Sequence, residues 1–252
     1  MVQGSAIRNV WQGACLRAIA LYLLLGSVPA RADEAAWHAL DEQANQLFEQ
    51  GRYTEAVTAA EQALAAGEAA FGPTDASLAS TLDTLALSCE RQGHFPEAKA
   101  HLLRALEIRQ AALGPTNADV ALTLNHLAGV YQQQGDYREV ERLLQQALAI
   151  DEQVFGAASP EVVNDLGNLA VVNHFEGYRA EAESLYRRAL VEGETTFGPN
   201  DPALAAILED YAVLLKEMKR WPEAQVVEGR LKHLRRDEGG VHRASHPGMN
   251  DG

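Results

Sequence analysis

The hydrophobic and polar positions of this chain follow a helical period that restarts every 42 residues. Within residues 117–158, apolar side chains recur at steps of three and four residues in two stretches, one on each side of Gly135. This spacing places the apolar side chains on one face of each of two helices. A glycine between the stretches provides the left-handed turn that ends the first helix. Each unit therefore predicts a helix–turn–helix.

Several independent columns keep the same step. Glycines recur at the turn, at Gly51, Gly93, Gly135 and Gly177, and glutamates follow at Glu55, Glu97, Glu139, Glu181 and Glu223. Residues that favour a helix N-cap recur at Asp75, Asn117, Ser159 and Asp201. Internal repetition of this length indicates stacked supersecondary units. We expect an array over residues 33–236, with repeats at about 35–74, 75–116, 117–158, 159–200 and 201–236.

The units resemble the tetratricopeptide repeat (TPR) family. In the third unit the resemblance rests on Leu127, Ala128, Tyr131, Gly135, Tyr137, Glu139, Val140, Ala147 and Leu148. The 42-residue step and the joint Phe71-Gly72-Pro73-Thr74-Asp75 are similar to the repeat subtype of kinesin light chains. The resemblance covers about residues 35–236 and implies an all-α fold, a right-handed α–α solenoid of five helix–turn–helix repeats.

The two ends of the array carry polar residues where inner repeats are apolar. Gln43 in the first repeat, and Glu228 and Lys232 in the fifth, occupy columns that are otherwise mostly leucine. Terminal repeats of a solenoid need such a polar outer face. We therefore expect a monomer. Residues 237–252 show no apolar period, and we expect a disordered tail there.

Residues 1–32 have the pattern of a secretory signal peptide. They contain three arginines, no acidic residue, a short apolar run from Ala18 to Ala30, and Ala30-Arg31-Ala32 directly before Asp33. The apolar run is shorter than the roughly 20 residues that a membrane anchor needs. We expect cleavage before Asp33, no stable membrane insertion afterwards, and a periplasmic or secreted protein.

Composition and motifs narrow the chemistry. The chain has 21 basic and 35 acidic side chains, a net charge of −14, whereas a nucleic-acid or anionic-membrane surface needs a basic stripe. Known catalytic motifs and metal-spaced cysteines are absent from the sequence. We therefore expect no enzyme, no cofactor and no metal site, the alternative being a weak metal contact of His242 and His246. Cys89 is interpreted as a small buried hydrophobe, or else as a reactive or intermolecularly bonded thiol.

The resemblance also implies where a ligand would bind, because first helices line the concave face of TPR arrays. The inward columns suggest a groove of Asp41, Asn45, Asp83, Leu87, Glu90, Asn125, His126, Gly129, Gln132, Asn164, Asn168, Val171, His174, Glu209, Val213 and Lys216. Asparagine offers both a donor and an acceptor to an extended backbone. The basic clamp that co-chaperone members use for a terminal carboxylate is missing, since its column here is Asp41, Asp83, Asn125, Gly167 and Glu209.

The leading hypothesis is a non-enzymatic protein–protein interaction module or scaffold of the cell envelope. It would bind an extended neutral or basic peptide segment in the groove, because acidic columns repel acidic termini. The alternative is a structural envelope protein associated with peptidoglycan or another glycan. Aromatic platforms for sugars are scarce, with Phe48 and Phe175 the candidates near the groove, and this scarcity favours peptide. A mixed surface without a ligand also remains open.

Overall fold

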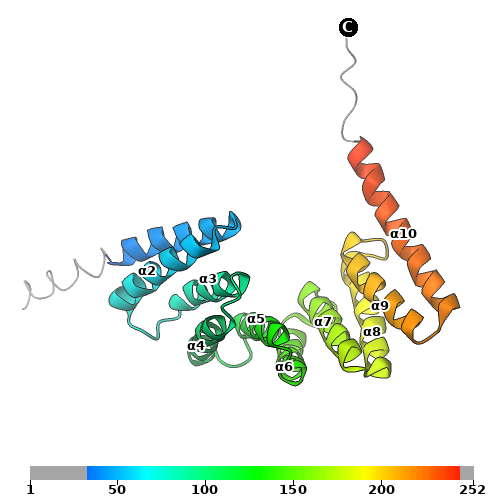
Figure 1. Ribbon diagram of the computed structural model, residues 1–252, viewed down its shortest axis with the longest axis horizontal. Helices are drawn as coiled ribbons and strands as arrows, with labels where there is room; N and C mark the ends of the chain where they lie inside the picture. Colours follow the sequence, from blue (N-terminus) through cyan, green and yellow to red (C-terminus); the bar gives the residue numbers. More distant parts are fainter. Residues whose placement is uncertain (1–32, 245–252) are drawn as a thin grey trace, which may run out of the picture. The chain divides into compact units, whose positions relative to one another are not determined.

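A computed structural model describes residues 33–244 of the chain, with side chains for residues 33–236. Within that range every regular element is a helix, and consecutive helices form antiparallel pairs (Figure 1), so the predicted all-α class is confirmed. The predicted signal peptide, residues 1–32, lies outside the described residues. The chain divides into two compact units, Met1–Ala112 and Leu113–Gly252.

The N-terminal unit packs through small residues. Its helices are residues 33–49, α2 (Tyr53–Phe71), α3 (Leu78–Arg91) and α4 (Phe95–Leu113). Ala44, Ala56 and Ala60 are fully buried with Leu85, and alanine lets neighbouring helices approach closely. A second cluster joins Leu78 and Leu82 of α3 to Ala105 and Ile108 of α4. Apolar burial of this kind is the main favourable term in folding.

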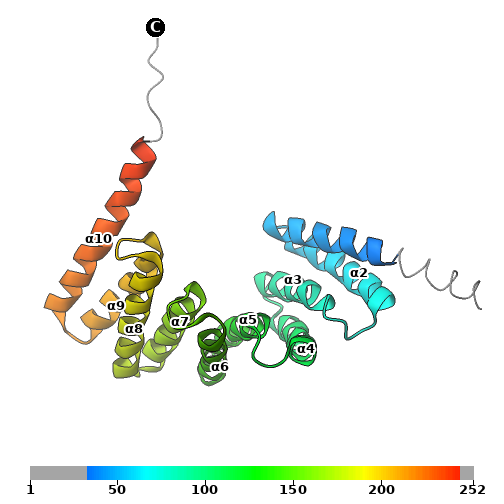
Figure 2. The same cartoon turned by 180° about the vertical axis from the view of Figure 1, so that it is seen from behind.

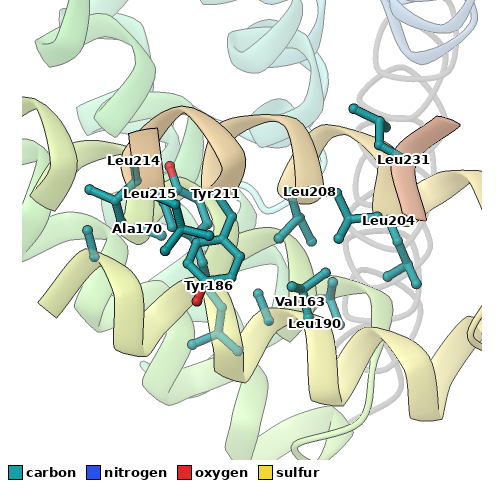
Figure 3. Packing of buried hydrophobic residues seen from close by; sticks show 14 of the residues in the cluster. Val163, Ala170, Tyr186, Leu190, Leu204, Leu208, Tyr211, Leu214, Leu215 and Leu231 are labelled. Atoms are coloured by element: carbon teal, nitrogen blue, oxygen red, sulfur yellow. The ribbon is translucent and has the colours of Figure 1, made fainter. Parts of the chain in front are cut away.

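The C-terminal unit has a larger core. Its helices are α5 (Ala118–Gln134), α6 (Tyr137–Phe155), α7 (Pro160–Glu176), α8 (Arg179–Phe197), the 3-10 turn η1 (Pro202–Leu204), α9 (Ala205–Glu217) and α10 (Trp221–Ala244). Helices α7, α8 and α9 lie side by side in both ribbon views (Figures 1 and 2). Tyr186 is almost completely buried between them, beside Tyr211, Leu214 and Leu215 (Figure 3).

The predicted caps and turns mark the helix boundaries. Gly135 and Gly177 have φ angles of 76° and 87°, the left-handed region that other residues rarely adopt. Asn117 accepts from the backbone N–H of Asp119 at 2.8 Å, and Ser159 accepts from that of Val162 at 3.2 Å. These hydrogen bonds satisfy first-turn N–H groups that have no partner within the helix. Local sequence signals therefore mark the boundaries of α5 and α7. The other two predicted caps differ, because α3 begins at Leu78 after Ser77, and Asp201 caps the turn η1 and not α9.

The C-terminal end of the array differs from the expectation in one respect. Lys232 is exposed and Glu228 pairs with Lys216 of α9, as polar terminal positions should. Helix α10, however, continues past Arg236 to Ala244, where a disordered tail was expected to begin. Adding a residue to a helix that has already formed costs little free energy. Residues 245–252 lie outside the described part of the chain.

Candidate functional site

In the N-terminal unit, two predicted groove residues are bonded to hydroxyl groups of α3. Asp41 accepts from Thr81 Oγ1 at 2.5 Å, and Asn45 accepts from Thr84 Oγ1 at 2.6 Å. These bonds connect the first helices of consecutive repeats. Asp41 and Asn45 therefore help to hold neighbouring repeats together, whatever else they contact.

Asp83 requires a correction to the predicted groove. Its Oδ2 lies 2.6 Å from Nη2 of Arg109, and about nine-tenths of each side chain is buried. The second helix of the same repeat thus supplies a cation that closes over the carboxylate, so Asp83 is not free to meet a ligand. Leu87 and Glu90, further along α3, are partly exposed and remain candidates.

In the C-terminal unit, three predicted residues line one hollow. Asn164, Asn168 and Val171 of α7 face α9 across a cleft of about 260 Å³. We call this hollow the α7–α9 cleft; it is lined by Pro160, Val163, Asn164, Gly167, Asn168, Val171, Tyr186, Phe197, Ala203, Ala206, Ile207 and Asp210. Burial raises the pKa of Asp210, the carboxyl on the α9 wall. The cleft combines amides, one carboxyl and an apolar floor.

Three other predicted residues of this unit are held in ion pairs or hydrogen bonds. Glu209 pairs with Arg235 at 2.7 Å, and Lys216 pairs with Glu228. His174 Nε2 lies 3.0 Å from a carboxylate oxygen of Glu217. Exposed pairs of this kind contribute only about 0–1 kcal/mol, so Glu209 and Lys216 can exchange their partners for a ligand at small cost.

The predicted residues of α5 follow that helix from the interior to the surface. Asn125, His126 and Gly129 are partly buried, whereas Gln132 is exposed. Asn125 donates from Nδ2 to Asp165 Oδ1 at 2.6 Å. On α9, Val213 is exposed over 44% of its surface. The structure therefore gathers Asn164, Asn168 and Val171 at one cleft, with these other residues outside its lining.

The sequence interpretation missed a second cavity, between α5, α6 and α7. It has a volume of about 250 Å³, and we call it the acidic pocket; it is lined by Ala118, Asp119, Leu122, Asn125, Asp151, Phe155, Glu161, Asn164 and Asp165. Asp151 and Asp165 are 4% and 0% exposed. Burial, together with the nearby Asp151 carboxyl, raises the pKa of Asp165 to about 7 despite the hydrogen bond from Asn125. Burial also raises the pKa of Asp151.

Three other features were checked in the part of the chain that the structure describes: metal sites, reactive thiols and membrane-spanning helices. No group of three or more histidine, cysteine or carboxylate side chains there is arranged to hold a metal ion. Cys89 is a buried free thiol, as expected, and burial raises its pKa, which keeps it protonated and a poor nucleophile. None of the helices between residues 33 and 244 is long and apolar enough to cross a membrane.

Comparisons with solved structures give several similar folds. A kinesin light chain protein from Podosopora anserina with nearly identical TPR-like repeats has a TM-score of 0.70 and 21% identity, over 83% of this chain and 97% of that one. BtubC (BKLC) from P. vanneervenii has a TM-score of 0.73 and 22% identity, over 90% and 94%. The pilF protein of Pseudomonas aeruginosa has a TM-score of 0.59 and 19% identity, over 87% and 80%.

At these identities the structural neighbours show the fold alone. A search of curated protein sequences gives no significant match. The family model of the tetratricopeptide repeat matches residues 34–111, 95–153 and 119–191, which together span more than half of the chain. TPR folds generally mediate protein–protein interaction and are typically non-enzymatic scaffolds. The chain belongs to the tetratricopeptide repeat family, with kinesin light chain-like repeat proteins among its structural neighbours.

Proposed function

We propose that this chain is a non-enzymatic interaction module that binds an extended, neutral or basic peptide segment of a partner protein. The observation that carries the proposal is the α7–α9 cleft, where Asn164, Asn168 and Val171 line one hollow. An extended peptide has backbone N–H and C=O groups that need partners. The two asparagine amides supply donors and acceptors, and the apolar floor accepts a side chain.

Charge supports the preference for neutral or basic segments. The chain carries a net charge of −14, and Asp210 stands on the wall of the cleft. Such a surface attracts basic segments and repels acidic termini. Because ion pairs at an open surface contribute only about 0–1 kcal/mol each, we expect modest affinity that weakens with salt.

We place the protein in the cell envelope, periplasmic or secreted, and acting as a monomer. The location is supported by the signal-peptide pattern of residues 1–32, and the monomer by the exposed polar Gln43 and Lys232 at the terminal repeats. An envelope location also limits the partners to exported proteins or exposed segments of membrane proteins.

A glycan-associated role is the second candidate, and one observation favours it. Phe175 is 69% exposed, and its ring lies nearly parallel to that of Tyr137, with centroids 6.1 Å apart. Exposed aromatic faces are suited to stacking against a sugar ring. Sedimentation of the protein with purified peptidoglycan, compared with a Phe175→Ala variant, separates this role from peptide binding.

The test of the main proposal is a charge-scanned peptide array probed at low and high salt. The double variant Asn164→Ala with Asn168→Ala removes both amides of the cleft, and the double variant Gln145→Ala with Gln146→Ala removes two exposed amides of α6 as a control. We expect neutral and basic peptides to bind the parent and the control but not the cleft variant. Preferential binding of acidic peptides, or unchanged binding by the cleft variant, would refute the proposal.

A further inference from the structure

One position near the end of each second helix faces a first helix, and it is filled differently along the repeats. In the second repeat it is Arg109, which pairs with Asp83 at 2.6 Å. In the fifth repeat it is Arg235, which pairs with Glu209 at 2.7 Å. Where a carboxylate stands on the first helix of these repeats, the second helix therefore supplies an arginine.

The first and fourth repeats close the same position without charge. It is Gly67 in the first and Gly193 in the fourth, and a Cβ atom on either would lie 2.5 Å from a leucine methyl group. Leucine side chains, Leu78 and Leu204, thus occupy the space that arginine takes elsewhere. In four of the five repeats the position is either neutralised by an ion pair or filled by apolar atoms.

In the third repeat this position has neither an arginine that forms an ion pair nor a glycine covered by leucine atoms. The position is Asp151, opposite Asn125, and a second carboxyl comes from Asp165 of α7, in the column where Thr81 and Thr123 stand. Asp151 and Asp165 are 4% and 0% exposed. A position that holds arginine in two other repeats thus holds a carboxyl here, and a position that holds threonine in the second and third repeats holds a second carboxyl, in the interior of one unit.

These buried groups lack donors. Among the described residues, no third group donates a hydrogen bond to Asp151 Oδ1, Asp165 Oδ2 or Asn125 Oδ1. The two carboxyls can bond only to each other, and only when one of them holds a proton. The amide of Asn125 satisfies only the other oxygen of Asp165. All three side chains line the acidic pocket. Buried acceptors are normally hydrogen-bonded, so three oxygens around one cavity without a donor from a third group point to a donor that binds there.

We propose that the acidic pocket receives the guanidinium group of an arginine side chain from the partner segment. The inference rests on the proposed function, since the bound peptide supplies the arginine. A guanidinium carries five N–H donors in a planar fork and has no acceptor, which suits two carboxyls and an amide oxygen. The arginine of the partner takes the place that Arg109 and Arg235 take in their own repeats.

The mouth and size of the pocket fit such a side chain. Leu122 and Phe155 line it and are 47% and 44% exposed, so they can cover the aliphatic stem of an arginine and present a ring face to its charge. Asp119 and Glu161 add carboxylates to the lining. A volume of about 250 Å³ is below the roughly 300–1,000 Å³ of small-molecule sites, as expected for one side chain.

Binding of arginine is expected to depend on pH, because it competes with a proton on the Asp165 carboxyl. Asp165 faces Asp151 of α6, Asn125 and Asp119 of α5, and Glu161 on its own helix. Burial and the neighbouring Asp151 carboxyl favour the protonated form of Asp165 below about pH 7, the pKa of this group. Arginine replaces that proton, so affinity should fall by up to about tenfold for each pH unit below 7.

The experiment titrates the full chain with N-acetyl-arginine amide and with the neutral isostere N-acetyl-citrulline amide, followed by NMR of the side-chain amide of Asn125. We expect a response to the arginine derivative only. Asp151→Asn and Asp165→Asn, which keep the shape of the pocket, should weaken the affinity for the arginine derivative at least tenfold. Asp151→Arg should abolish it, because the new arginine fills the site from within. Glu176→Gln, an exposed charge on α7, is the control and should bind as the parent does.

Equal responses to arginine and citrulline, no response to arginine, or full binding by Asp151→Arg would overturn the proposal. The same variants, probed on the peptide array, separate this inference from the proposed function. If array peptides bind the α7–α9 cleft of Asp151→Arg as tightly as that of the parent, the pocket has no role and the groove stands. If arginine amide binds but no peptide does, the pocket stands and the proposed function fails.

Discussion

Arg109 of α4 and Asp83 of α3 form an ion pair of 2.6 Å, with about nine-tenths of each side chain buried. Removing one partner from a buried pair leaves an uncompensated charge, which typically costs about 3–5 kcal/mol. Replacing both partners by apolar residues of similar volume is often neutral. Each partner therefore matters to the stability of the N-terminal unit mainly because the other one is present and would be left as an unpaired buried charge.

The first prediction tests that dependence. Arg109→Met should lower the free energy of unfolding by about 3–5 kcal/mol, and Arg109→Met combined with Asp83→Leu should recover most of the loss. Urea denaturation of the three proteins measures both values. A single variant within about 1 kcal/mol of the parent would mean that the pair is more hydrated than its burial indicates.

Leu127 of α5 is 1% exposed and lies in the middle of the C-terminal unit's first helix pair. Leu127→Ala should destabilise the protein by about 2–5 kcal/mol, because it removes buried methyl groups and leaves a cavity. Leu103→Ala, at a position that is 40% exposed on α4, should cost less than about 1 kcal/mol. Equal melting temperatures for the two variants would contradict the assigned core.

The boundaries of helices such as α5 and α7, and the core columns, could be predicted from sequence because each depends on local signals. A glycine such as Gly135 and a cap such as Asn117 act within a few residues, and the 42-residue step repeats them. The TPR fold and the burial of Leu127 and Cys89 follow from these columns. By contrast, α10 extends past Arg236 without an apolar pattern that predicts it.

The candidate site could be predicted only in part. Asn164, Asn168 and Val171 line one cleft because their columns share a helix face. The closure over Asp83 depends on Arg109, a residue of the second helix, and columns of first helices carry no information about it. Asp151 also lies on a second helix, so the columns of first helices carry no information about it either. Asp151 is the acidic member of a column that otherwise holds Gly67, Arg109, Gly193 and Arg235, and a comparison of these five residues would have singled it out.

The carboxyl pair of the acidic pocket predicts a pH dependence of stability. The pKa of Asp165 is about 7 in the folded chain against 3.8 as its ordinary value. The folded state therefore holds a proton that the unfolded state releases, and stability falls as pH rises from about 4 to 7. This loss in the free energy of unfolding is at most about 1.4 kcal/mol per pH unit, and Asp165→Asn removes it.

Urea denaturation at several pH values measures the difference between Asp165→Asn and the parent. The variant should be the more stable protein at about pH 8, and its advantage should shrink toward pH 4. A constant difference for Asp165→Asn would show that the carboxyl titrates normally.

The proposed location makes a separate prediction. If residues 1–32 act as a signal peptide, the mature chain begins at Asp33 and is recovered in the periplasmic or secreted fraction. Intact-mass spectrometry of the native protein determines its first residue. A membrane-bound chain that retains residues 1–32 would contradict both the cleavage and the location.

The measurement that tests the central claim most directly is NMR mapping of a basic peptide from the array onto the isotope-labelled protein. The account predicts that the amide signals of α7 and α9 shift, among them the side-chain amides of Asn164 and Asn168 and the backbone of Val171. Signals of the exposed positions of α8 should stay in place. Shifts confined to α6, α8 and α10, with Asn164 and Asn168 unchanged, would contradict the claim that the first helices carry the binding site.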